Sequence, residues 1–293
     1  MPKIVQFTHP GHEHGPEKNN PNHKNWNAGA HKRKFLHATG RYVQGNQLHS
    51  GELLFWGEWE PPSVVNEFAS RPTWFHPRWL HRPYLPEVIP DPHSDGASLQ
   101  NTDPYVFDGP FKYAICKQFK SRTGRPTQLA NLDRGSIVLF GSTGNQNKPN
   151  AFFQLDTVFV VGDYLEYDVS DPAPLSLPEL RDYHTAVFQM AFPNPTKNSL
   201  KLRLYFGATY DNPFEGMYSF SPAQVFNGQS QGFPRVALKD LPYLTNNLNA
   251  APKISGVSID QSTIFWEEIR TISREQGCVE GVHYDFWRRE ELG

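Results

Sequence analysis

Turn-forming residues interrupt this chain so often that its apolar segments are short. Of 293 residues, 26 are Pro and 22 are Gly. The longest apolar runs, Ile137–Phe140 and Thr157–Val161, fall far below the ~20 residues that span a bilayer, so we expect no membrane partner. The segments between turns are rich in β-branched and aromatic residues, as is typical of strands. The pattern predicts an α+β protein that is mostly β.

Seven segments carry this strand pattern and are bounded by Gly, Pro, Asn or Asp. They are Lys3–Thr8, Glu52–Trp59, Phe111–Lys117, Ser136–Gly141, Phe152–Gly162, Leu200–Phe206 and Met217–Phe220. Residues 142–150 consist almost entirely of turn-forming types, because Asn and Gly tolerate positive φ and Pro cannot enter a central ladder. A hairpin is therefore predicted across residues 136–162.

Two segments carry helix signals. The longer predicted helix is Gln261–Gln276, with Ser258 or Asp260 capping its start and Gly277 suited to a left-handed stop. A shorter helix is predicted over Leu177–Val187. The apolar face expected for the longer helix is Ile264, Phe265, Ile269 and Ile272.

Charge, cysteine content and missing motifs exclude several classes. A net charge of −2 argues against a generally basic nucleic-acid coat but leaves local patches open. The two cysteines, Cys116 and Cys278, form no Cys-x-x-Cys motif, and no signal peptide is recognised, so we expect a cytoplasmic location. The chain lacks P-loop, dinucleotide-fingerprint, His-Glu-x-x-His and Gly-x-Ser-x-Gly patterns.

Histidine and tryptophan are concentrated at the start of the chain. Ten of the twelve His and five of the seven Trp precede residue 94, and a turn-rich connection follows at residues 86–96. We predict one large domain, 1–293. In it, residues 1–93 form a rim, 94–250 the main β region and 251–293 a C-terminal helical segment.

The first candidate site follows the first predicted strand. His9, His12 and His14 surround Glu13, and neutral imidazoles are good ligands for zinc, nickel or iron. These residues could bind a metal through the three histidines or act as acids and bases. A hydrated loop, or a contact to phosphate or base, is the alternative.

Two further segments combine cations with rings. In 31–37, Arg33 and Lys34 could contact phosphate, or they could lie on solvated surface. In 71–84, Trp74 and Arg78 belong to a run of rings and arginines that suits a single-stranded nucleic acid or a nucleotide. A proline-pinned loop with exposed arginine tips is the alternative there.

The strand at residues 52–60 places acids beside indoles. Alternation puts Trp56 and Glu58 on one side and Trp59 on the other. The Trp56 ring could stack on a nucleobase while the Glu58 carboxylate accepts a hydrogen bond from its edge. Glu58 could also act as a general acid. The alternative is that Glu58 lies on an edge strand in water.

Three other polar residues are candidates for special roles. Asn101 and Asp103 could read a base edge or cap turns. Asp156 stands inside an apolar strand and needs a partner, such as an Arg or Lys.

The stretch Leu132–Ser142 resembles the PUA-like domains, which include the ASCH, EVE and YTH modules. Gly135-Ser136 occupies the place where Gly-Asp is frequent in that superfamily, and Phe55–Trp59 resembles a second barrel strand. The start of the chain is similar to nucleotide-modification-associated domains of bacteria and phages. The resemblance implies a small mixed β-barrel core, an aromatic pocket for a nucleotide or base, and a setting in DNA modification or phage defence.

These observations favour a protein that binds a nucleotide or an extruded nucleobase, including a modified one, in single-stranded or flipped form. Trp56, Trp59 and Trp74 would supply rings, Asn101, Asp103 and Glu58 polar contacts, and Arg33, Lys34 and Arg78 positive charge. One alternative is a metal- or His/Glu-dependent hydrolase, with a divalent metal as its cofactor. The other is an interaction subunit without a small ligand. The sequence leaves the oligomeric state open.

Overall fold

The computed structural model describes residues 1–16, 25–67, 77–92, 98–197, 200–228, 232–248, 251–287 and 291. The protein is mostly β, as the sequence predicts, with 39% strand and 16% helix. In the described part of the chain, no helix combines the length and the apolar character needed to cross a membrane.

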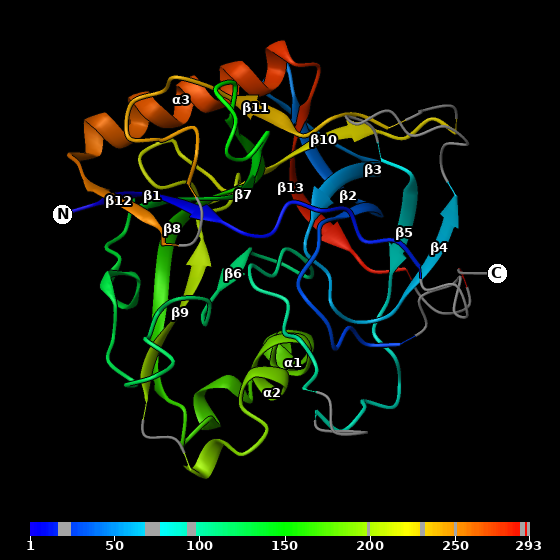
Figure 1. Cartoon of the computed structure of the whole chain (residues 1–293), viewed down its shortest axis with the longest axis vertical. Helices are drawn as coiled ribbons and strands as arrows, with labels where there is room; N and C mark the ends of the chain where they lie inside the picture. Colours follow the sequence, from blue (N-terminus) through cyan, green and yellow to red (C-terminus); the bar gives the residue numbers. More distant parts are fainter. Residues whose placement is uncertain are drawn as a thin grey trace.

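Among the described residues, seven strands form a first sheet (Figure 1). Its spatial order is β12 (Lys253–Gly256), β1 (Lys3–Thr8), β7 (Ile137–Gly144), β8 (Phe152–Asp168), β9 (Lys201–Gly207) and β6 (Lys112–Tyr113), with β11 (Val236–Leu238) paired to β8. Strand β1 is parallel to β7 and antiparallel to β12. Strands β7 and β8 are antiparallel, which confirms the predicted hairpin.

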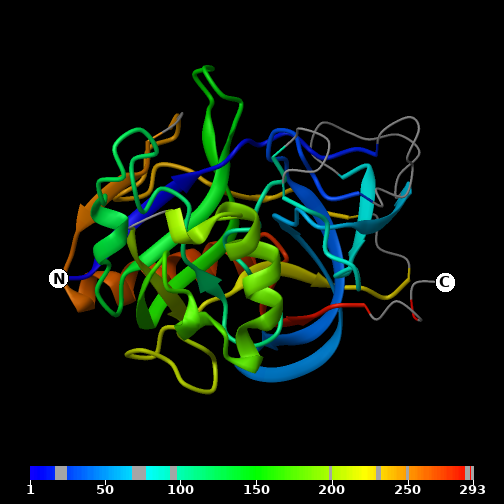
Figure 2. The same cartoon turned by 90° about the horizontal axis from the view of Figure 1, so that it is seen from below.

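Six described strands form a second sheet beside the first, and Figure 2 shows the same arrangement from below. Its order is β13 (Val279–Asp285), β10 (Ser221–Val225), β3 (Gln47–Gly57), β2 (Lys34–Gln44), β5 (Trp79–Pro83) and β4 (Ser63–Glu67). Strand β13 also pairs with β2, so β2, β3, β10 and β13 are each hydrogen-bonded to two others of these four.

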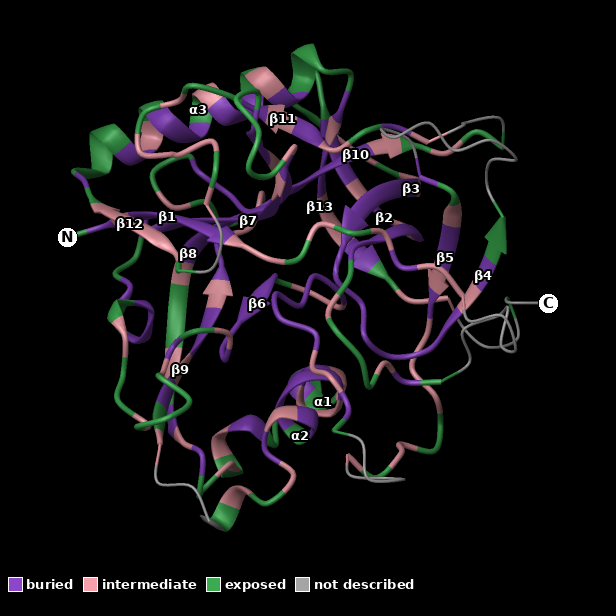
Figure 3. Ribbon diagram, in the orientation of Figure 1, coloured by how far each residue is buried: buried purple, intermediate pink, exposed green. Residues whose placement is uncertain are grey.

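The long C-terminal helix, α3 (Ile259–Glu275), forms where the sequence predicts it. Ser258 closes a capping box with Gln261, and Gly277 follows at φ +82°. The predicted apolar face is wrong at Ile264, which is 69% exposed, because Trp266 takes a place on the buried face. Figure 3 shows the exposed outer side of α3 above the buried strands.

The other helical segments are short. They are η2 (Gln128–Asn131), η3 (Ala173–Leu175), η4 (Pro178–Leu180), α1 (Arg181–Tyr183), η5 (His184–Phe188), α2 (Gln189–Ala191) and η6 (Pro195–Lys197). Four of them follow one another between Pro178 and Ala191, where one helix over Leu177–Val187 is predicted. The segment packs Tyr183, Val187 and Phe188 into the core.

Several strand predictions need correction. Residues 34–44 form β2, although 34–37 are expected in a rim loop and no strand is predicted over 38–44. Residues 79–83 form β5 where a loop is predicted, while 68–76 lie outside the described residues. The strand predicted at Met217–Phe220 lies instead at Ser221–Val225, and that predicted at Phe111–Lys117 shrinks to Lys112–Tyr113.

Both faces of the second half of β3, residues 53–57, are buried. Phe55 and Trp59 belong to one apolar core with Phe7 and Phe140, whereas Trp56 belongs to another, under α3. The predicted alternation along this strand is confirmed, but neither side of its second half faces solvent. The end of β3 therefore delivers the residues that follow it into the interior, between the two sheets.

Candidate functional site

The segment after β1 crosses from the first sheet to the second. The His9 amide donates to the Gly141 carbonyl at 2.7 Å, which keeps His9 beside β7. Further along, the His14 amide donates to Arg33 at 2.8 Å and the Arg33 amide donates to His12 at 2.9 Å. Figure 1 shows this crossing between β1 and β2. It brings His9 to the place where β2 begins and β3 ends.

Glu58, just after β3, lies at the centre of a buried polar cluster. Its carboxylate contacts His9 Nδ1 at 3.1 Å and His31 Nδ1 at 3.0 Å. The Arg33 guanidinium pairs with it as well. The Glu58 side chain is only 1% exposed, against 28% for His31. The cluster therefore meets solvent on the His31 side.

Glu60 adds a second carboxylate to this cluster. One of its oxygens lies 2.9 Å from His31 Nδ1, and the other accepts a hydrogen bond from the side-chain amide of Asn27. The Glu60 amide donates to Thr102 Oγ1 at 2.9 Å, which fixes the backbone. One ligand atom from each of His31, Glu58 and Glu60 lies within 4.8 Å of the others, the only such group of three in the described ranges.

Asp156, on β8, faces the same cluster from the first sheet. One of its oxygens lies 3.6 Å from Arg33 Nη1, and the charges of Arg235 and Arg33 both act on it, so these arginines are the partners that a carboxylate in an apolar strand requires. Neither Asp156 oxygen accepts a hydrogen bond within the described structure. Asp156 is thus a second carboxylate within reach of the Arg33 charge.

The two histidines that contact Glu58 differ in charge. Burial lowers the pKa of His9 to about 3, against the pull of Glu58. Burial also acts to lower the pKa of His31, but Glu58 and Glu60 outweigh it and raise that pKa to about 10. Burial alone would raise the pKa of Glu58, yet Arg33 and the histidines hold it well below its usual range. A neutral and a charged imidazole therefore flank an ionised carboxylate.

The three histidines predicted as a metal site do not come together. His12 is exposed, and His14 is buried with its ring edge-on to His81 at 5.6 Å. Glu13 accepts hydrogen bonds from the backbone amides of Arg78 and Trp79 at 2.8 and 2.9 Å, so it ties the crossing segment to β5. Of this motif, only His9 reaches Glu58.

Trp56 and Trp59 are core residues, which corrects the expectation that they are available for stacking. They are 6% and 0% exposed, and their indole N–H groups donate to the carbonyls of Phe233 and Pro62. The reason is that each face of β3 packs on an apolar core. Trp74 lies outside the described residues.

The predicted phosphate contacts at Arg33 and Lys34 are also turned inward. Lys34 Nζ donates to the Trp59 carbonyl, and burial lowers the pKa of Lys34 to about 8. Arg78 is exposed, pairs with Glu67 at 3.3 Å and stacks over Trp79, away from the cluster. These three cations do not converge on one site.

Asp103 is near enough to Glu58 to be affected by its charge, and both Asp103 and Asn101 contact Cys116. The Asp103 carboxylate accepts the backbone amides of Ala114, Ile115 and Cys116 at 3.1, 2.8 and 2.7 Å. Burial raises the pKa of Asp103 to about 6. Burial likewise raises the pKa of the Cys116 thiol, against a contact from Asn101. Asp103 thus holds the loop at residues 114–116.

His31 and Glu60 are the cluster members that the sequence motifs did not select. A signal was present, because residues two apart in an extended segment point the same way, as Glu58 and Glu60 do directly before Pro61-Pro62. His31 comes from a different segment, and its approach depends on β2 pairing with β3.

Searches of protein-family models, curated proteins and solved structures each find no match to this chain. The geometry of the cluster therefore carries the functional interpretation.

Proposed function

We propose that this protein is a hydrolase that binds a divalent cation through His31, Glu58 and Glu60. The observation that carries the proposal is the spacing of these three groups, whose ligand atoms lie within 4.8 Å of one another. A set of one imidazole and two carboxylates suits zinc, manganese or ferrous iron. His9, on the same Glu58 carboxylate, would complete the site.

The proposed chemistry is activation of water. A bound divalent cation lowers the pKa of its water to around 7 and so supplies a hydroxide at neutral pH. His9 is neutral and 10% exposed, so its imidazole can ligate the cation without first losing a proton.

Cation binding requires Arg33 to release Glu58, and Asp156 makes that release inexpensive. An unpaired guanidinium in the interior would cost several kcal/mol. The Asp156 carboxylate lies 3.6 Å from Arg33 and has no other hydrogen bond, so it can take over the charge. We therefore expect Arg33 to shift from Glu58 to Asp156 when a cation binds.

A nucleotide, or an extruded base of a nucleic acid, is the substrate we propose, in DNA modification or phage defence. The cyclic pairing of β2, β3, β10 and β13 supports a PUA-like β-barrel in the second sheet. A cytoplasmic site of action is part of the same proposal, supported by unpaired Cys116 and Cys278.

The first test is metal content together with turnover. We expect purified protein to carry about one equivalent of a divalent transition metal and to hydrolyse at least one of a nucleoside triphosphate, a nucleoside and a single-stranded oligonucleotide. Glu60→Gln should lose the metal and about 100-fold or more of the activity, because a ligand is lost. The exposed Glu275→Gln on α3 is the matched control and should change neither.

Two outcomes separate the alternatives. Turnover that persists after a chelator removes every metal would contradict the proposed role of a cation. His9 and Glu58 would then remain as the candidate acid–base pair. A folded, metal-loaded protein with no turnover on the panel would contradict the hydrolase and leave binding as the function.

A further inference from the structure

A stretch of the chain next to the cluster carries only positive charge. Residues 109–132 contain Lys112, Lys117, Lys120, Arg122 and Arg125 and neither Asp nor Glu. Lys112 turns inward and donates to the carbonyls of two nearby residues. The other four are exposed. A chain whose net charge is −2 thus has one strongly basic surface segment.

Three of these cations line a groove of about 570 Å³, which we call the basic groove. Its charged side is Lys117, Lys120 and Arg122, and its apolar side includes Phe119 and Ile254. None of the three cations forms an ion pair with any residue that the structure describes. The groove therefore has uncompensated positive charge beside apolar surface.

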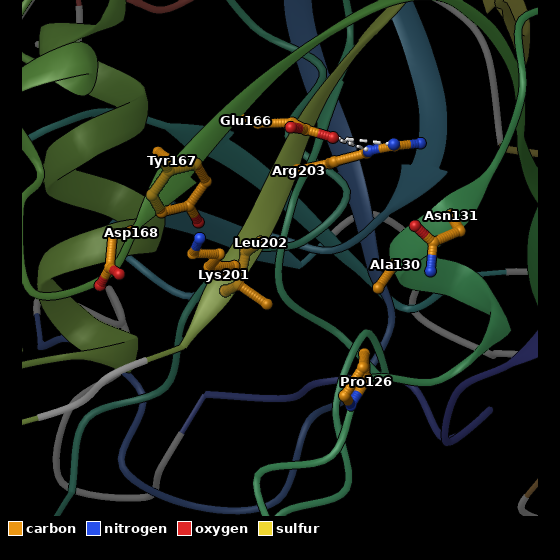
Figure 4. A pocket seen from close by; sticks show the side chains of 9 residues that line it. All are labelled: Pro126, Ala130, Asn131, Glu166, Tyr167, Asp168, Lys201, Leu202 and Arg203. Carbon is orange, nitrogen blue, oxygen red and sulfur yellow. Dashed lines mark hydrogen bonds and ion pairs between the residues drawn. The ribbon is translucent and has the colours of Figure 1, made fainter.

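Another pocket shows that this is not a general property of the surface. The pocket in Figure 4, of about 420 Å³, has two acids and two cations in its lining. Glu166 pairs with Arg203 at 2.8 Å there, and Asp168 and Lys201 line the same space. In that pocket the acids compensate the cations, whereas the lining of the basic groove contains no acid.

The loop that carries the cations is held in place before any ligand arrives. Phe119 and Pro126 form a β-bridge, and the Lys120 amide donates to the Arg125 carbonyl at 2.9 Å. Thr127 Oγ1 donates to the Lys117 carbonyl at 2.6 Å. Because the backbone is fixed, binding orders only the side chains, which limits the entropic cost.

One cation of the basic groove, Lys117, is near the candidate site. The charge of Lys117 acts on His9, and the backbone amide of the neighbouring Cys116 donates a hydrogen bond to the Asp103 carboxylate.

We propose that the basic groove binds the phosphodiester backbone of a single-stranded nucleic acid, with a base against Phe119 and Ile254. A single strand offers both spaced phosphates and unpaired ring faces, which match the two sides of the groove. A duplex would hide those rings. The inference rests on the proposed function in making the strand the substrate, although binding itself does not need the metal.

The test is fluorescence anisotropy with a labelled 12-nucleotide single strand in the presence of EDTA. The double variant Lys120→Gln/Arg122→Gln should weaken binding at least 10-fold. With three phosphate contacts, the logarithm of the binding constant should fall against log salt with a slope of about −2, and the variant should lose about 1.4 of that slope. The matched control is Lys148→Gln/Lys239→Gln, two exposed cations elsewhere, and thermal unfolding should be the same for both variants.

Equal affinity of the double variant and the wild type would overturn the proposal. So would tighter binding of the duplex form of the oligonucleotide, or of a nucleoside monophosphate at equal phosphate concentration. Because the assay excludes metal, a failed hydrolase leaves a positive result intact. Conversely, if the double variant binds and hydrolyses the strand as the wild type does, the binding role of the basic groove is overturned and the proposed hydrolase is not.

Discussion

Two buried clusters in the described part of the chain pair glutamates with cations, one around Glu280 and one around Glu58, and they differ in what they could do. Glu280, on β13, is 0% exposed and pairs with Arg270 at 3.1 Å and Arg274 at 2.7 Å. Tyr218 donates a further hydrogen bond to it. Glu58 is equally buried, but two of its three partners are imidazoles.

The difference lies in which partners can change. Arginine stays charged at every accessible pH, so the cluster at Glu280 has one charge state and one arrangement. Imidazoles can lose or gain a proton and can ligate a metal, and the Glu58 cluster has two more carboxylates, Glu60 and Asp156, within reach. We infer that Glu280 holds α3 against the second sheet and that Glu58 serves chemistry.

The largest expected effect is on stability at Glu280. Glu280→Ala leaves Arg270, itself 9% exposed, with only Glu267, which is 53% exposed, as a partner, and should lower the free energy of unfolding by about 3–5 kcal/mol. Glu58→Ala should cost only about 1–2 kcal/mol, because Asp156 can compensate Arg33. Urea denaturation of both variants checks this. Equal losses would contradict the distinction between the clusters.

A smaller effect is expected from pH, measured with EDTA present. Because Glu58 and Glu60 raise the folded-state pKa of His31 from 6.5 to about 10, its contribution to stability is complete below pH 6.5 and is lost as the pH rises through 10. Relative to His31→Gln, the wild type should lose about 1–2 kcal/mol between pH 6.5 and 9.5, after allowance for solvent screening. Urea denaturation across this range gives the difference, and parallel pH profiles would contradict the paired state of His31.

Local signals predicted much of the fold. Strand β1, the β7–β8 hairpin and α3 each combine a periodic apolar pattern with nearby turn or cap residues. Strand β2 was not predicted, because Arg33 and Lys34 at its start are typical of a charged segment in solvent. Those cations are buried only because Glu58 and the Trp59 carbonyl lie opposite them.

The candidate site was predicted in part, through the need of Glu58 and Asp156 for partners. Alternation placed Trp56 and Glu58 on one side of β3, but it could not show that both sides of the strand are covered. Nor could it show that His31 would reach Glu60, because that contact depends on two segments pairing across the second sheet.

Anomalous diffraction from crystals soaked in Zn²⁺ tests the central claim most directly. The account predicts one strong peak about 2.0–2.2 Å from His31 Nδ1 and from carboxylate oxygens of Glu58 and Glu60. In the same crystals, Arg33 should have moved from Glu58 to Asp156. No peak at this position under saturating zinc, with Arg33 still on Glu58, would contradict it.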